Sequence, residues 1–330
     1  MFGSVRFILA WFVVIAHLSQ SYSYSSAMSV YAFYMLSGFL MTLIMNERYH
    51  YTLQGVIRYC INRALRIFPQ YWILCLLALL FILFISAEHA KILHPAFQIP
   101  TGFHEVFANS FIFGLYPESI NPMARLVPQA WALHVELVFY LFIGLFLGRN
   151  LPIALTWFIL SVAYHIAANT YGFPRYSPIY AASIAFSSGC LLYHIKPFIM
   201  NSWSYSFKIM LALVIFYLFF VAYSGTLPFG RIMWPFYTNL FLFALCLYQL
   251  SMIPRVPGWS TKVDRWLGDL SYPIYLNHWL VALFVSYYIN IPLSLSLLLY
   301  SIPIILILGY ILARVVEQPI EKIRRRIAAN

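Results

Sequence analysis

The chain has 330 residues, of which 63% are hydrophobic and only 9% are charged, and its mean hydropathy is +0.80. A water-soluble protein carries charge on about a quarter of its residues, so this composition excludes an ordinary soluble domain and indicates a membrane protein. The net charge of +11 is typical of nucleic-acid-binding proteins, but the basic residues are scattered between apolar segments, so we expect no nucleic-acid partner.

A helix needs about 20 mostly apolar residues to span a bilayer. We therefore predict an all-α polytopic protein, with about ten transmembrane helices in one bundle and a single integral-membrane domain over residues 1–330. The first segment could instead be the apolar region of a cleaved signal peptide, although a first span explains it equally well. The approximate spans are 5–21, 29–46, 68–86, 131–148, 151–168, 178–195, 207–224, 232–251, 267–288 and 294–316.

The distribution of lysine and arginine predicts the orientation of these spans. If the amino terminus is cytoplasmic and the ten spans alternate, 16 of the 20 basic residues fall in cytoplasmic segments. This bias is the positive-inside rule, and it predicts that both termini are cytoplasmic. The positive net charge is then mainly a signal of topology. The four basic residues on the other side are Lys91, Arg125, Arg175 and Arg231.

Three connecting segments are distinctive. Residues 46–68 are expected in the cytoplasm, and residues 254–266 form a shorter basic cytoplasmic loop. Residues 87–130 form an outer segment that is too long for a simple connector. Its apolar part, residues 106–115, is too short to span a membrane and is expected to be interfacial or re-entrant.

Several kinds of chemistry find no support in the sequence. The four cysteines lie far apart without a C-x-x-C pair, so we expect apolar core residues rather than a metal site or disulfides. Nucleotide-binding glycine loops, a Walker loop, G-x-S-x-G and H-E-x-x-H are also absent. Nucleotide hydrolysis and metalloprotease chemistry are therefore unsupported.

The first span carries an arginine and a histidine in "RFILAWFVVIAH", and all ten residues between Arg6 and His17 are apolar. On a helix, eleven residues advance about 20° past three full turns, which places both side chains on one face about 16–17 Å apart. This pattern suits an anionic ligand that enters from the cytoplasm and reaches a buried base. Alternatively, Arg6 is a snorkelling anchor and His17 is a buried histidine that bonds a neighbouring helix.

Other polar residues within the apolar segments are candidates for the same site. Glu136 could orient His17, stabilise its protonated form or pair with an arginine, and it could equally be a structural ion pair. His278 and its neighbour Asn277 are candidate substrate contacts, with core packing as the alternative.

Two further arginines lie in the cytoplasmic segment 46–68. Arg63 and Arg66 are three residues apart, which places them on one helical face. They could anchor lipid headgroups, or they could bind the phosphates of a ligand through the forked donors of their guanidinium groups.

The order of these motifs resembles that of the membrane-bound acyltransferase 3 family. "VRFILAWFVVIAH", "FYMLSGFLMT", "RALRIFPQYW", "AWALHVELVFYL", "GDLSYPIYLNHW" and "VEQPIEKIRRR" match six family segments in the right order. The chain has Arg6-Phe7 where many relatives have Arg-Gly, and His134 where they have serine. We expect no fused SGNH-type domain, because the chain ends directly after the last span.

This resemblance implies transfer of an acyl group, most often acetyl from acetyl-CoA, to a hydroxyl of a surface glycan or lipid-linked glycan at the bacterial inner membrane. Acyl-CoA is then a donor substrate, and no cofactor is permanently bound. His17 would be the general base, which suits a neutral imidazole, and Glu136 would orient it or contact the sugar. Arg6, Arg63 and Arg66 would bind the CoA phosphates. The rival interpretations are a transporter, which also has ionisable groups at mid-membrane, and a non-catalytic scaffold.

Overall fold

A computed structural model describes residues 2–20, 24–116, 123–174, 179–198, 211, 233–253 and 258–329. Throughout these residues the regular structure is helical, which confirms the predicted all-α class. Five of the described helical segments are long and apolar enough to cross a membrane, and Phe2–Leu18 and Phe236–Ser251 are shorter apolar helices. The protein is therefore a multi-pass membrane protein. The number of ten spans and the position of the termini stay predictions, and the predicted span 207–224 lies outside the described residues apart from residue 211.

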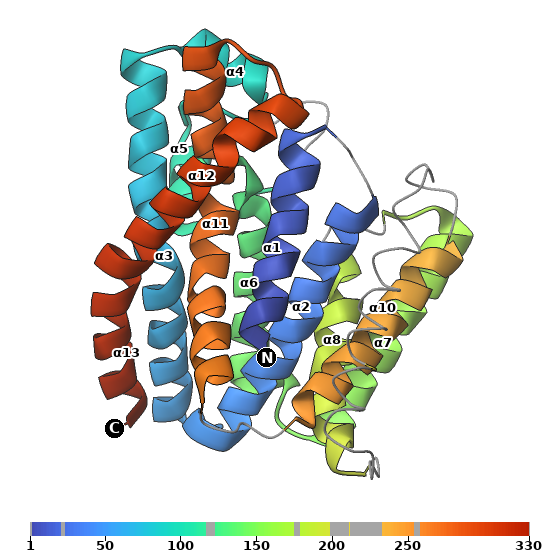
Figure 1. The fold of residues 1–330 in the computed structure, drawn as a ribbon. Coiled ribbons are helices and arrows are strands. Elements are labelled where there is room, and N and C mark those ends of the chain that lie inside the picture. The colour runs from blue at the N-terminus through green and yellow to red at the C-terminus, as the bar shows by residue number, and fades with distance from the viewer. Residues whose placement is uncertain are drawn as a thin grey trace. The chain divides into compact units, whose positions relative to one another are not determined.

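The described helices follow one another along the chain with short connections (Figure 1). They are α1 (Phe2–Leu18), α2 (Tyr24–Ile44), α3 (Leu53–Phe84), α4 (Ala87–Leu93), α5 (Phe103–Phe111), α6 (Trp131–Phe142), α7 (Leu151–Tyr171), α8 (Ile179–Ile195), α10 (Met233–Ser251), α11 (Trp259–Ile289), α12 (Leu295–Ile311) and α13 (Gln318–Ala329). Short π or 3-10 turns are η1 (Met45–Tyr49), η2 (Pro128–Ala130), η3 (Ile143–Leu147), η4 (Lys196–Phe198) and η5 (Leu312–Glu317).

Some helices extend well beyond the apolar segments that predicted them. α3 begins at Leu53, so Arg63 and Arg66 lie inside a 32-residue helix rather than in a connecting loop. The predicted basic loop 254–266 is likewise helical from Trp259 onward. Hydropathy detects only the part of a helix that lies in lipid, whereas backbone hydrogen bonding continues into polar, amphipathic turns.

The chain folds into two compact units that are interleaved in sequence. The first is formed by Met1–Val13, Tyr22–Tyr59 and Phe139–Gly268, and the second by Val14–Ser21, Cys60–Val138 and Asp269–Asn330.

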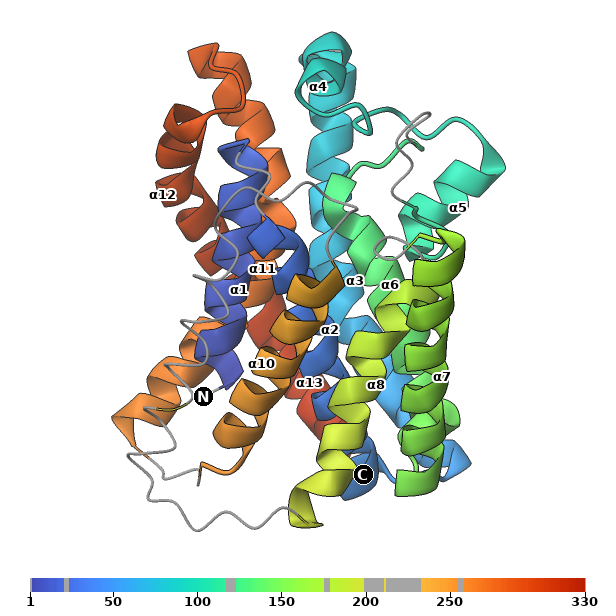
Figure 2. The ribbon, with the colours of Figure 1, turned by 90° about the vertical axis from the view of Figure 1, so that its right-hand side faces the viewer.

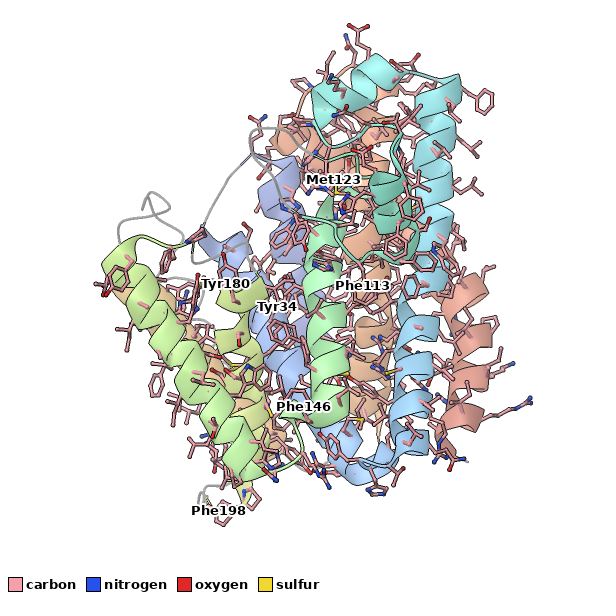
Figure 3. The ribbon with its side chains drawn as sticks, turned by 180° about the vertical axis from the view of Figure 1, so that it is seen from behind. Tyr34, Phe113, Met123, Phe146, Tyr180 and Phe198 are labelled. Carbon is pink, nitrogen blue, oxygen red and sulfur yellow. The ribbon has the colours of Figure 1, made fainter. Side chains whose placement is uncertain are left out.

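In the first unit, α7, α8 and α10 lie side by side (Figure 2), and α2 packs closely against α8 because small residues allow the backbones to approach. A methyl group on Gly189 of α8 would overlap the carbonyl oxygen of Met35 on α2, and one on Gly38 would overlap that of Phe186. Next to this crossing, Tyr34 stacks on Phe186 with ring centroids 4.9 Å apart (Figure 3). The crossing is therefore tight and specific.

The amino-terminal end of α1 is held by α11 within the same unit. The carboxylate of Asp264 accepts hydrogen bonds from the backbone and side chain of Ser4, both at 2.8 Å, and from the backbone of Gly3 at 3.3 Å. A side chain on Gly3 would overlap the carbonyl oxygen of Asp264. Asp264 thus caps the first turn of α1, where unpaired N–H groups favour a negative charge.

The second unit contains the long segment 87–130, which is folded rather than extended. Glu105 accepts hydrogen bonds from the backbone of Thr101 at 3.0 Å and of Ala124 at 3.3 Å. These hydrogen bonds, that from Thr101 first, lower the pKa of Glu105. His134 of α6 accepts from the backbone of Gly114 at 3.2 Å, which ties the segment to α6. The predicted outer segment is therefore a defined substructure built around α4 and α5.

Candidate active site

His17 and His278 form a hydrogen-bonded pair in the second unit. The Nδ1 atom of His17, near the end of α1, lies 3.0 Å from the Nε2 atom of His278 on α11. The two ring planes are inclined by only 24°, as an in-plane hydrogen bond between imidazoles requires. His278 is fully buried, whereas His17 keeps part of its surface accessible. The partner that orients His17 is therefore another imidazole.

A backbone carbonyl determines the tautomers of both rings. The Nδ1 atom of His278 lies 2.7 Å from the carbonyl oxygen of Tyr275, which can only accept, so Nδ1 carries the proton. In neutral His278 the Nε2 atom then has a lone pair and accepts from Nδ1–H of His17. Neutral His17 is left with a lone pair on Nε2. The arrangement thus presents a base at the accessible ring.

Tyr275 is itself fixed by η2. The side-chain amide of Gln129 donates to the carbonyl oxygens of Tyr275 at 3.1 Å and Leu276 at 2.6 Å, and the hydroxyl of Tyr275 donates to the Gln129 carbonyl at 3.0 Å. Gln129 is buried, so these bonds are shielded from water. They hold the turn of α11 that sets the tautomer of His278.

A third histidine lies beside this pair. The ring of Trp279 contacts His17 and His278, with centroids 5.6 and 5.9 Å apart, and also contacts His94 at 4.7 Å. His94 follows α4 in the segment 87–130. Trp279 is buried and separates or flanks all three imidazoles. The sequence did not single out His94, because its neighbours in the fold are more than 70 residues away in the chain.

A basic cluster occupies another part of the second unit, where α13 lies beside α3 (Figure 1). The buried amide of Asn62 accepts from Arg63 and from Arg324, each at 3.0 Å, and donates to the Arg324 carbonyl at 3.0 Å. Arg324 also pairs with Glu321 at 2.8 Å. Arg66 is within electrostatic reach of Arg324. Three arginines, Arg63, Arg66 and Arg324, thus gather between the two helices.

Glu136 lies near this cluster rather than at the nitrogen that orients His17. The hydroxyl of Tyr272 on α11 donates to the carbonyl oxygen of Ile67 at 2.8 Å, and Tyr272 is within electrostatic reach of Glu136, Arg66 and Glu317. Glu317 in turn accepts from the buried amide of Gln70 at 3.1 Å. Glu136 therefore belongs to a mixed set of charges contributed by four helical segments.

The helix α11 connects the two groups of polar residues. Tyr272 and His278 are six residues apart on this helix, which corresponds to about 9 Å along its axis. The charged groups around Tyr272 and the histidine pair therefore lie on consecutive turns of one helix. Such an arrangement can bind an elongated ligand whose anionic part and reactive part are separated.

The remaining predicted site residues are placed as follows. α1 is a continuous helix through Arg6 and His17, as the spacing predicted, and Arg6 is partly buried in the first unit. Asn277 is fully buried and donates its amide to the carbonyl oxygen of Ile305 on α12 at 3.1 Å. In the structure Asn277 therefore joins α11 to α12, next to Gly309.

The sequence model of the acyltransferase 3 family, described as an acyltransferase domain, matches residues 3–314. Since the match covers nearly the whole chain, the protein belongs to this family, and it is a membrane-bound acyltransferase. No match was found among curated proteins or among solved structures. Within the described residues, no group of three or more His, Cys, Asp or Glu side chains is arranged to hold a metal ion.

Proposed function

We propose that this protein is a bacterial inner-membrane O-acyltransferase that transfers an acyl group, acetyl in the first instance, from cytoplasmic acyl-CoA to a hydroxyl of a surface glycan. The acceptor class comprises O-antigen, capsule and exopolysaccharide, free or linked to lipid. The observation that carries the proposal is the hydrogen-bonded pair of His17 and His278, which leaves a lone pair on an accessible imidazole.

The reaction uses the free Nε2 atom of His17. This atom takes the proton of the acceptor hydroxyl while the hydroxyl oxygen bonds to the thioester carbon, giving a tetrahedral intermediate with a negative oxygen. The carbon–sulfur bond then breaks, the carbonyl re-forms, and the leaving CoA thiolate takes the proton from Nε2 of His17. His278 accepts the Nδ1–H of His17 throughout, so the ring keeps its orientation.

The arginine cluster is the proposed site for the phosphates of CoA. Arg63 and Arg66 supply forked donors, and Arg324 adds a third positive charge beside them. Arg6 is assigned to the same ligand from the family resemblance. The offset of about 9 Å along α11 between Tyr272 and His278 suits a donor whose thioester lies away from its phosphates. Glu136 and Asn277 are proposed as a helper near the acceptor and a substrate contact, respectively.

The test is acetyl transfer by purified protein in lipid nanodiscs, with radiolabelled acetyl-CoA and surface polysaccharide from a strain that lacks the gene. Wild-type protein should transfer label to the glycan, and His17→Ala should abolish transfer while retaining its thermal transition. The matched control is His104→Ala, which removes an exposed histidine of the segment 87–130. Normal transfer by His17→Ala would rule out the assigned base, and vesicle uptake of substrate without transfer would favour a transporter.

A further inference from the structure

The segment 87–130 brings a second functional imidazole to the site. His94 contacts Trp279 edge-on, with centroids 4.7 Å apart and ring planes inclined by 78°. The same indole lies 5.6 Å from His17, and His17 is within electrostatic reach of His94. His94 is therefore adjacent to the proposed base, although it comes from a different segment of the chain.

The tautomer of His94 is fixed by its own turn. The backbone N–H of Ala96 donates to Nδ1 of His94 at 3.1 Å, so Nδ1 is unprotonated and the proton of the neutral ring is on Nε2. The turn is held by two backbone hydrogen bonds, from Phe97 to the His94 carbonyl at 2.9 Å and from Arg125 to the Ala96 carbonyl at 2.8 Å. His94 thus offers an N–H donor on a rigid support.

His94 stays neutral in the working pH range. Burial, followed by the positive charges of Arg125 and of a protonated His17, lowers the pKa of His94 to about 3. A neutral ring with Nδ1 occupied cannot act as a base, but its Nε2–H can donate a hydrogen bond. The two imidazoles are therefore complementary: His17 presents a lone pair and His94 presents a proton donor.

Acyl transfer needs both of these functions at once. While Nε2 of His17 takes the proton of the attacking hydroxyl, negative charge develops on the carbonyl oxygen of the thioester, and a fixed donor is required to stabilise it. His17 cannot supply that donor, since its Nδ1–H is engaged by His278. We infer that His94 is a catalytic residue whose Nε2–H donates to the thioester carbonyl oxygen and stabilises the tetrahedral intermediate. This inference rests on the acyltransferase reaction proposed above.

Two isosteric substitutions separate this role from a structural one. In His94→Gln the side-chain amide can place an N–H donor where Nε2–H was, but the acceptor for Ala96 is lost. In His94→Asn the side-chain oxygen can still accept from Ala96, but the donor at the Nε2 position is lost. A catalytic donor predicts recovery by glutamine, and a role confined to holding the turn predicts recovery by asparagine.

The experiment measures kcat and KM of acetyl transfer for wild type, His94→Ala, His94→Gln, His94→Asn and His104→Ala, all in nanodiscs with thermal midpoints recorded. Removal of one such donor lowers kcat by about 10²–10³-fold, so His94→Ala and His94→Asn should fall by that factor with little change in KM for acetyl-CoA. His94→Gln should recover a large part of kcat. The pH profile of His94→Ala should run parallel to that of wild type, because His94 does not titrate in this range.

Recovery by asparagine but not glutamine, unchanged kcat in all three variants, or a change confined to KM would each overturn the assignment. If His94→Ala does not fold, the glutamine and asparagine variants decide the question. Loss of transfer in His17→Ala with full activity in the His94 variants overturns only the role of His94. Absence of transfer by the wild-type protein overturns the proposed function and the role of His94 together.

Discussion

The chemistry of the histidine pair depends on one backbone carbonyl. Because the Tyr275 oxygen can only accept, the proton of His278 is on Nδ1, and the lone pair of His17 is consequently on Nε2. In serine hydrolases a carboxylate holds the catalytic imidazole in this way. A neutral imidazole fixes the tautomer equally well, but it does not supply a negative charge to stabilise the imidazolium. The base at His17 is therefore oriented more than it is strengthened.

Replacement of His278 tests this orienting role. His278→Ala removes the acceptor for Nδ1–H of His17, so the ring can rotate or adopt the other tautomer, and kcat should fall by about 10²-fold or more. His278→Gln can place an amide oxygen near the former Nε2 position and should restore part of the loss. Steady-state kinetics should show the effect in kcat rather than in KM for acetyl-CoA. A purely structural role is indicated if both variants lose thermal stability and neither alters kcat among the folded molecules.

The arginine cluster allows a second prediction at the same scale. A hydrogen bond to a charged group contributes about 1.5–3 kcal/mol, so Arg66→Ala should raise the Kd for acetyl-CoA by about 10- to 100-fold. The measurement is the shift of thermal midpoint with acetyl-CoA concentration. Arg58→Ala, on the same helix, is the matched control, since Arg58 contacts only the backbone of Gln54 in the described hydrogen bonds. Equal affinities for all three proteins would contradict a phosphate site at Arg66.

Among the helices, α1 is the element that carries both a predicted cytoplasmic arginine and the proposed base, and its first turn is fixed by Asp264. Burial would raise the pKa of Asp264, but the hydrogen bonds that it accepts from the amino-terminal end of α1 outweigh burial and lower the pKa. The carboxylate is therefore ionised in the fold. Its stabilising effect is complete above the ordinary aspartate pKa and is lost as the pH falls through the lowered value.

Asp264→Ala should consequently destabilise the protein by about 1 kcal/mol at pH 7, the usual effect of losing a helix cap. The deficit should shrink below about pH 4, because wild-type Asp264 becomes protonated there as well. Thermal midpoints in detergent at both pH values measure the difference, and Lys262→Ala, an exposed neighbour on α11, is the control. A deficit that is independent of pH would show that Asp264 acts through packing rather than charge.

The sequence predicted the elements better than their partners. Length and hydropathy located α7 and α8 to within a few residues, because a span must be long and apolar. Helical spacing placed Arg63 and Arg66 on one face, but it contains no information about Arg324, which joins them from α13. The pairing of His17 with His278 bridges 261 residues, so only the tertiary structure reveals it.

For the molecule as a whole, membrane orientation and the order of polar groups in the second unit agree. Arg66 precedes the carboxyl end of α3 at Phe84 by 18 residues, or about 27 Å of helix. The arginine cluster and the segment 87–130 are thus attached to opposite ends of α3. The charge bias of 16 to 4 places the first in the cytoplasm and the second outside. Donor and acceptor would then approach the histidine pair from opposite sides.

Cysteine labelling tests this arrangement in intact cells. Lys91→Cys in α4 and Arg326→Cys in α13 replace exposed residues, whereas three of the four native cysteines are buried and the fourth is partly buried. A membrane-impermeant maleimide should label Lys91→Cys before permeabilisation and Arg326→Cys only after it, with wild-type protein as background. Acyl-CoA is a cytoplasmic donor, so the arginine cluster must face that compartment to bind it. The reverse labelling pattern would place the cluster outside the cell and would contradict both the orientation and the proposed donor.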